Sequence, residues 1–77
     1  MSDIQYFINI GMNIKRMREE RNINQRELAL RCNIDFQNLS RIERGSPGLT
    51  VKTLVKIAKG LCVKPEDLLK FKEAILP

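Results

Sequence analysis

The sequence predicts an all-α domain of about five short helices. Apolar residues recur every three or four positions through most of the 77-residue chain, which is the spacing of one helix face. Good N-cap residues stand ahead of several of these stretches, and no window alternates polar and apolar residues for long enough to form a β-strand. A chain of this length holds one domain at most, so we interpret residues 1–77 as a single unit.

The first helix is expected from about Asp3 to Arg21. Ser2, with Gln5 three positions later, fits a capping box at its start. Gly11 interrupts the helix at a cost of about 1 kcal/mol relative to Ala, which indicates that a neighbouring segment packs closely there. One apolar face is formed by Phe7, Ile10, Ile14 and Met17.

The second and third helices are expected close together. Asn24 is a good N-cap for a second helix over residues 25–32. Asn33 then suits the left-handed conformation that often follows a helix end. Asp35 is the N-cap of the third helix, which ends before Gly45 because glycine is favoured just past a helix C-terminus.

The fourth helix opens at Thr50, and its inward face is formed by Leu54, Ile57, Ala58 and Leu61. The fifth opens with Pro65, a favoured first helical residue, followed by two acidic residues in the first turn. Two apolar stripes follow on this fifth helix, the first made of Leu68, Phe71 and Ile75 and the second of Leu69 and Leu76.

Composition excludes most kinds of chemistry. The chain has no histidine, which removes Ser-His and Cys-His catalysis and every His-ligated metal site. Cys32 and Cys62 are too few and too far apart for a zinc site or a disulfide framework. No nucleophile–base pair or glycine-rich phosphate loop is present, so we expect no enzyme, no cofactor, no metal and no small-molecule substrate.

The chain carries no segment near the ~18 consecutive apolar residues of a membrane span, and its start is not a secretory signal. We therefore expect a soluble, cytoplasmic protein without a membrane partner. The formal net charge of +5 favours an acidic partner only weakly, since many small domains carry such a charge for solubility. The positions of the charged residues are more informative than the net charge, because all seven arginines lie between positions 16 and 44. Because the arginine fork suits phosphates and guanine edges, this half is the expected contact side for a polyanion.

Residues 25–44 match the proportions of a helix-turn-helix, with a helix of about eight residues, a short turn and a helix of about nine. Ala29 supplies a small residue where the two helices cross, and Asn33 supplies the turn. Gln37, Ser40 and Arg41 leave the outer side of the second helix polar. Apolar anchors for both helices and the turn are Leu28, Cys32, Ile34, Leu39 and Ile42.

Three segments carry a family resemblance: IKRMR at 14–18, NQRELA at 24–29 and LSRIERG at 39–45, continued by LTVKTLVKIAKGLCVKPEDLL. The chain resembles the Cro/C1-type (XRE) helix-turn-helix proteins over roughly residues 8–70. This resemblance implies a compact five-helix, lambda-repressor-like domain of the stand-alone type. It also implies a transcription regulator, such as a repressor, that binds double-stranded operator DNA as a homodimer.

The resemblance places four side chains on the base-reading side of the third helix. Gln37 can pair with adenine and Arg41 with guanine, and Ser40 is expected to contribute to specificity beside them. Phe36 can pack on a thymine methyl group, or it can be a half-buried aromatic residue on the flank of the domain.

The resemblance also assigns backbone contacts and one internal ion pair. Contacts with DNA phosphates are expected from Gln25, Asn38, Arg44 and Lys52. For Gln25 and Lys52, an ordinary solvated surface position is the alternative. Arg18 and Glu43 correspond to positions that pair in phage-repressor members, which implies a structural ion pair between the first and third helices.

Dimerisation is expected because a single domain reads only about four to six base pairs, whereas two domains read a palindrome. The apolar stripes of the fifth helix exceed what one core needs, so Leu69 and Leu76 are expected at the partner. A C-terminus packed only within its own chain is the alternative. The other functional class left open is an antitoxin-like or protein-interaction module whose main partner is a protein.

Overall fold

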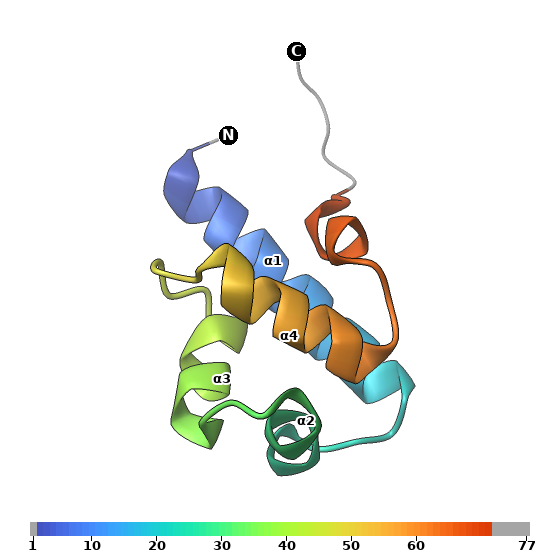
Figure 1. Cartoon of the computed structure of the whole chain (residues 1–77). Coiled ribbons are helices and arrows are strands. Elements are labelled where there is room, and N and C mark those ends of the chain that lie inside the picture. Colours follow the sequence, from blue (N-terminus) through green and yellow to red (C-terminus); the bar gives the residue numbers. More distant parts are fainter. Residues whose placement is uncertain (1, 72–77) are drawn as a thin grey trace.

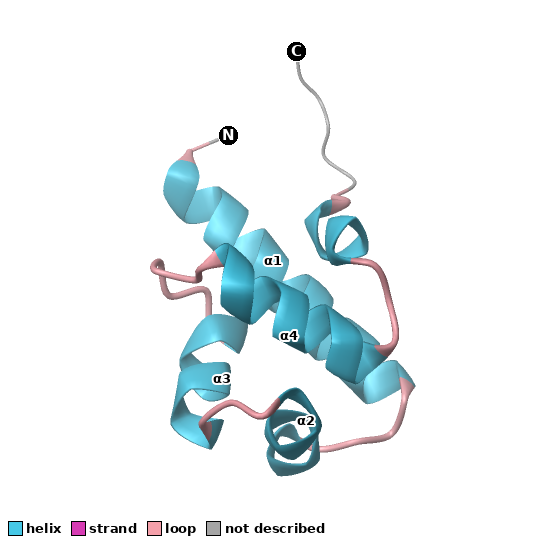
Figure 2. Ribbon diagram, in the orientation of Figure 1, coloured by secondary structure: helices cyan, strands magenta, loops and turns pink. Residues whose placement is uncertain are grey.

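The structure, a computed structural model, describes residues 2–71 and is helical in every regular element within that range. Figure 2 shows these helices joined by short loops. The elements are α1 (Asp3–Glu20), α2 (Gln25–Cys32), α3 (Phe36–Glu43), α4 (Val51–Leu61) and the 3₁₀ helix η1 (Pro65–Leu69). The all-α class is therefore confirmed. The bounds of α2 equal those expected, and α3 starts after Asp35 as expected but ends at Glu43, one residue earlier.

The helix-turn-helix lies at one end of the molecule. In Figure 1, α2 and α3 occupy the end opposite to the start of α1 and to η1. α4 packs against α2, η1 and α1, and α3 packs against α1 and α2. Because α1 and α4 fill the middle, the outer sides of α2 and α3 are left free of other elements.

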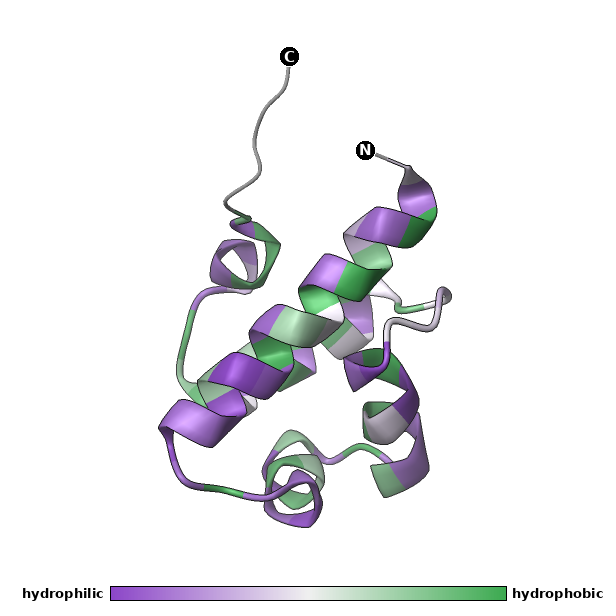
Figure 3. Ribbon diagram, turned by 180° about the vertical axis from the view of Figure 1, so that it is seen from behind, coloured by the Kyte–Doolittle hydropathy of each residue, from purple (hydrophilic) through white to green (hydrophobic). Residues whose placement is uncertain are grey.

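The core draws on every element. Helices α1, α2 and α3 each carry hydrophobic and hydrophilic residues in Figure 3, as expected for helices with one side in the core. The buried apolar residues are Ile10, Ile14, Leu28, Ala29, Cys32, Leu39, Ile42, Leu54, Ile57, Ala58, Leu61 and Leu68. No helix among residues 2–71 is long and apolar enough to cross a lipid bilayer.

Each α-helix begins at a side-chain cap. The N–H of the third helical residue donates to the side-chain oxygen of the N-cap in all four cases, at 2.8–3.1 Å. The caps are Ser2, Asn24, Asp35 and Thr50, as the sequence predicts. The expected capping box at α1 is only half formed, because the Gln5 side chain donates to Asn9 instead.

Each α-helix also ends in the same way, with one residue in the left-handed region and a Schellman pair of backbone hydrogen bonds. For α2 the Asn33 N–H donates to the Leu30 carbonyl and the Ile34 N–H donates to the Ala29 carbonyl. The left-handed residues are Asn22, Asn33, Gly45 and Cys62. Asn33 and Gly45 were expected in these positions. Cys62, at φ 61°, is a residue type for which this backbone region is unfavourable.

Gly11 marks the crossing of α1 and α3. A Cβ atom at this position would meet the backbone carbonyl oxygen of Ile42 and would lie 2.7 Å from that of Glu43. The close approach inferred from an isolated glycine inside a helix is therefore confirmed. Because no side chain separates the two backbones, α3 lies directly against α1.

The fifth α-helix is a correction to the prediction. The structure has a 3₁₀ helix over Pro65–Leu69, so the described chain contains four α-helices rather than five. Asn13 on α1 explains part of this difference, since its Nδ2 donates to the carbonyls of Leu68 and Lys70, both at 3.0 Å. An α-helix would use those carbonyls for its own hydrogen bonds. Ile75 and Leu76 lie outside the described residues.

Asp67 holds the start of η1. Its Oδ2 accepts from the backbone N–H of Lys64 at 3.0 Å, and its Oδ1 lies 3.1 Å from the Lys70 Nζ. The hydrogen bond with Lys70, followed by that from the Lys64 N–H, lowers the pKa of the Asp67 carboxyl. Leu68 is thereby held in the core, fully buried.

Candidate nucleic-acid interface

The turn between α2 and α3 fixes the angle of the helix-turn-helix. Asn33 adopts φ 55° and ψ 49° and reverses the chain, and Asp35 then caps α3. Leu28 and Leu39, one from each helix, are fully buried beneath the turn. Since both helices are anchored on the core, the side of α3 away from it is presented to solvent as a rigid surface.

The outer side of α3 gathers the expected base-reading residues. Gln37 and Arg41 are exposed, while Phe36 and Ser40 are half-buried. Together with Arg44 they line one shallow hollow. The structure thus brings all four expected base contacts to the same surface.

Ser40 and Arg44 are joined within that surface. The Arg44 Nη1 donates to the Ser40 Oγ at 2.7 Å. This bond draws the Arg44 guanidinium back along α3 towards the base-reading side, and it occupies one acceptor position of the Ser40 hydroxyl. The hydroxyl hydrogen of Ser40 remains available to an acceptor.

The expected phosphate contacts surround this surface from several elements. Asn38 lies half-buried on α3 beside a second hollow that also involves the loop before α4, and Lys52 is exposed in the first turn of α4. Gln25, the first residue of α2, is half-buried, and its Nε2 donates to the Glu43 Oε1 at 2.9 Å. One of its two amide hydrogens is therefore already bound inside the protein.

Arg18 and Glu43 form a bidentate ion pair between α1 and the end of α3. The Arg18 Nε lies 2.8 Å from one carboxylate oxygen, and its Nη2 lies 3.0 Å from the other. The side chains are only 11% and 2% exposed. The bond with Glu43 raises the pKa of the Arg18 guanidinium above its ordinary value, although burial acts against this. The third donor, Nη1, reaches the Ile23 carbonyl at 3.0 Å.

The ion pairs within residues 2–71 leave three arginines of the helix-turn-helix without an acidic partner. They occupy Arg16, Arg18, Arg31 and Lys70. No acidic side chain in this part of the chain pairs with Arg26, Arg41 or Arg44. Unpaired guanidinium groups on one surface are suited to a polyanion.

Sequence reasoning missed three structural roles. Asn13 binds the η1 segment, and Arg21 joins the two chain segments after α1 and at the end of α4 by donating from Nε to the Leu61 carbonyl at 3.0 Å. Arg26 stacks on the ring of Phe36, with 4.4 Å between its guanidinium carbon and the ring centroid. Each contact joins residues from different elements, for which local sequence patterns carry no signal.

Comparison with known proteins places this chain in a family. A family model described as helix-turn-helix, HTH_3, matches residues 14–68, which is most of the chain. The control protein C.BamHI of Bacillus amyloliquefaciens is 36% identical over 62 residues, covering 79% of this chain and 76% of that protein. The chain belongs to the HTH_3 family. HTH_3 proteins of this XRE, Cro/C1 type are DNA-binding transcription regulators and not enzymes.

Solved structures agree with this HTH_3 assignment. The restriction-modification controller protein C.Esp1396I is 35% identical and superposes with a TM-score of 0.75, covering 88% of this chain and 86% of that one. The controller protein C.AhdI of Aeromonas hydrophila has a TM-score of 0.78 over 80% of this chain and 94% of its own. At 22% identity, C.AhdI shows the shared HTH_3 fold alone.

Proposed function

We propose that the protein regulates transcription by reading a specific duplex-DNA sequence through α3. The observation that carries this proposal is the shallow hollow on α3, lined by Phe36, Gln37, Ser40, Arg41 and Arg44, whose arginines have no acidic partner among residues 2–71. Arg41 pairs with a guanine, Gln37 with an adenine, and Ser40 hydrogen-bonds a base edge. Phe36 lies beside these residues and borders the same hollow.

Gln25, Asn38, Arg44 and Lys52 bind backbone phosphates on both sides of the groove in this proposal. These residues come from α2, α3 and α4, so the contacts fix the position of α3 without reading sequence themselves. Gln25 uses the amide hydrogen that Glu43 leaves free. With about six phosphate contacts in total, the logarithm of the affinity falls with the logarithm of salt concentration with a slope near −5.

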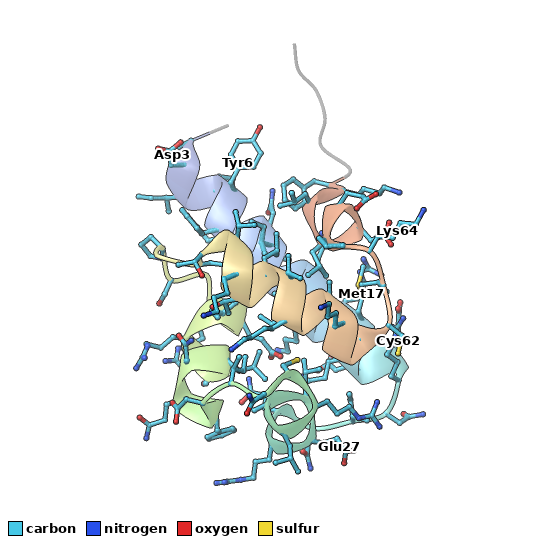
Figure 4. All side chains as sticks on the ribbon, viewed as in Figure 1. Asp3, Tyr6, Met17, Glu27, Cys62 and Lys64 are labelled. Carbon is cyan, nitrogen blue, oxygen red and sulfur yellow. The ribbon has the colours of Figure 1, made fainter. Side chains whose placement is uncertain are left out.

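The protein binds as a homodimer on a palindromic operator. At the end away from α3, Leu69 and Tyr6 are exposed, with 47% and 46% of their surface free. Figure 4 shows Tyr6 at the same end of the molecule as η1, and its ring lies 5.8 Å from that of Phe71. This apolar surface supports Leu69 as a dimer contact; Leu76, the other residue expected there, lies outside the described residues.

A controller role in a restriction-modification system is the context that the named relatives favour. C.BamHI is named a control protein, and C.Esp1396I is a restriction-modification controller protein. A transcription regulator must be in the compartment that holds its DNA. In bacterial cells, such as those of Bacillus amyloliquefaciens, that compartment is the cytoplasm, and we place this protein there.

The test of DNA reading is selection from a pool of random 30-base-pair duplexes. We expect a palindrome to be enriched, with half-sites about one helical turn apart, roughly 34 Å. On the selected duplex, Arg41→Ala costs about 1–3 kcal/mol at one base position and relaxes the preference there. Arg16→Ala is the matched control, because Arg16 is an exposed arginine of α1 paired with Glu20. Failure of the folded protein to enrich any sequence contradicts the proposal.

The test of dimerisation is sedimentation equilibrium of the free protein. Leu69→Lys is expected to yield a monomer with weaker, non-cooperative binding to the palindrome. Leu30→Lys, at an even more exposed leucine on α2, is the control and is expected to remain dimeric. A monomeric wild-type protein contradicts the homodimer. If that monomer captures one stoichiometric protein and leaves no DNA footprint, the antitoxin-like alternative replaces the regulator.

A further inference from the structure

Arg26 and Phe36 connect the starts of the two helices of the helix-turn-helix. Arg26 is the second residue of α2 and Phe36 is the first of α3. The Arg26 guanidinium lies over the ring face, 4.4 Å from its centroid. The interaction orders a long side chain that is otherwise exposed to solvent.

The position of Phe36 places this stack at the centre of the free surface. Phe36 lines two separate shallow hollows. The first involves Arg18, Asn24, Gln25 and Arg26, and the second involves Gln37, Ser40, Arg41 and Arg44. The ring is therefore a ridge between the proposed phosphate-binding start of α2 and the proposed base-reading side of α3, and Arg26 lies on the α2 side of that ridge.

Arg26 differs from the other arginine of α2 in its partner. Arg31 pairs with Glu27 at 3.2 Å on the same helix. Arg26 instead contacts the face of the Phe36 ring, and no acidic side chain among residues 2–71 forms an ion pair with it. A cation–π contact uses no oxygen acceptor, so the guanidinium N–H groups of Arg26 remain available to phosphate oxygens.

We propose that Arg26 is a DNA contact that binds a backbone phosphate at the edge of the groove, and that Phe36 acts chiefly as its positioning residue. The proposal rests on the proposed function, since it requires α3 to face duplex DNA. The stack fixes the guanidinium before DNA arrives, so less side-chain entropy is lost on binding. The ring face covered by Arg26 is not available to a thymine methyl group.

The first experiment measures the affinity for the selected duplex as a function of salt. One phosphate contact contributes a slope of about 0.9, which corresponds to roughly a fivefold change in affinity between 1 M and 0.15 M salt. Arg26→Ala is therefore expected to weaken binding about fivefold at 0.15 M salt on every sequence and to reduce the slope by about one. Arg31→Ala removes the same charge from the same helix and is expected to leave both quantities close to wild type.

The second experiment separates positioning by Phe36 from contact with a base. Phe36→Leu keeps an apolar side chain but removes the aromatic face, so it is expected to weaken DNA binding. In the Arg26→Ala background, the same change is expected to cause little further loss of affinity. Phe36→Trp keeps the face and is expected to restore binding. Replacement of thymine by uracil in the duplex removes the methyl groups and is expected to leave the effect of Phe36→Leu unchanged.

Three results overturn the inference. They are wild-type affinity in Arg26→Ala, a loss in Arg26→Ala confined to one base pair, and a Phe36→Leu effect that disappears on uracil-containing DNA. Melting temperatures of all variants establish that each is folded. If the wild-type protein enriches no duplex, the proposed function itself fails; if it binds and Arg26→Ala binds equally well, only the role of Arg26 fails.

Discussion

Arg18 and Glu43, 25 positions apart in the chain, close a buried contact between α1 and the last residue of α3 with two hydrogen bonds of 2.8 and 3.0 Å. The same carboxylate also accepts from Gln25 at the start of α2. One acidic group thus ties three helices together directly behind the proposed DNA-binding surface. Its neutralisation by Arg18 also keeps a negative charge from facing a polyanion.

Removal of Arg18 is expected to destabilise the protein strongly. Arg18→Met keeps the length of the side chain but leaves the Glu43 carboxylate buried without its cation, which costs about 3–5 kcal/mol of unfolding free energy. Chemical denaturation measures this loss. The double variant Arg18→Met, Glu43→Leu is expected to recover much of it, because no unpaired charge is left. An unchanged melting temperature in the single variant contradicts a structural role for the pair.

Gly11→Ala is expected to disrupt the contact between α1 and α3. The new methyl group would meet the main-chain oxygens of Ile42 and Glu43, which cannot move without shifting α3. Overpacking of this kind costs about 1–3 kcal/mol or more, which outweighs the gain of about 1 kcal/mol from the better helix propensity of Ala. Thermal unfolding checks this expectation, and a variant more stable than the wild type contradicts it.

Gly60→Ala offers a matched comparison inside another helix. Here the added Cβ would meet the Cys32 Sγ, a side-chain atom, while the nearest backbone atom of that residue lies at an ordinary 3.5 Å. Gly60→Ala alone is expected to be destabilising, and the further change Cys32→Ala is expected to restore stability in part. No side-chain truncation can relieve Gly11→Ala in the same way. If Cys32→Ala restores none of the stability lost in Gly60→Ala, the Cys32 thiol is not what limits this site.

Cys62→Gly is expected to stabilise the protein. Cys62 ends α4 in the left-handed region, which costs a residue with a Cβ atom about 1–2 kcal/mol. Glycine avoids this cost, but it also has more conformational freedom in the unfolded chain. The free energy of unfolding is therefore expected to rise by a net amount of about 0.5–1 kcal/mol. Cys62→Ala removes the same thiol and keeps the strain. The two variants compared by denaturant unfolding should therefore differ, and equal stabilities would be evidence against strain at this helix end.

The two thiols are expected to react differently. Cys62 is exposed, whereas Cys32 is buried. Burial raises the pKa of the Cys32 thiol. The folded state therefore holds the Cys32 proton more tightly than the unfolded state. The protonated thiol contributes fully to the free energy of unfolding below the ordinary thiol pKa of about 8.5, and this contribution is lost as the pH rises above that value.

Thiol labelling and unfolding at two pH values measure this difference. We expect one thiol to react rapidly in the native protein and the second to react only after unfolding. Between pH 8 and pH 10, the wild type is expected to lose more stability than Cys32→Ala does. Rapid labelling of both thiols in the native state would contradict the burial of Cys32.

The sequence by itself determined the local structure. Ser2, Asn24, Asp35 and Thr50 cap the four helices where their side-chain chemistry predicts, and Asn33 turns the chain because its backbone tolerates positive φ. The family motifs extend over the residues that the helix-turn-helix model matches. These features depend on residues only a few positions apart, so the sequence displays them directly.

Apart from the Arg18–Glu43 pair, which the family resemblance implied, only the tertiary structure decided which distant groups meet. The expected fifth α-helix has a good Pro65 start and periodic apolar residues, yet Asn13 of α1 binds the carbonyls that would continue it. Arg26 and Phe36 likewise stack only because the turn brings the starts of α2 and α3 together. Periodicity reports which side of a helix is apolar, but the partner of a polar side chain is chosen by packing between elements, to which local sequence contributes no signal.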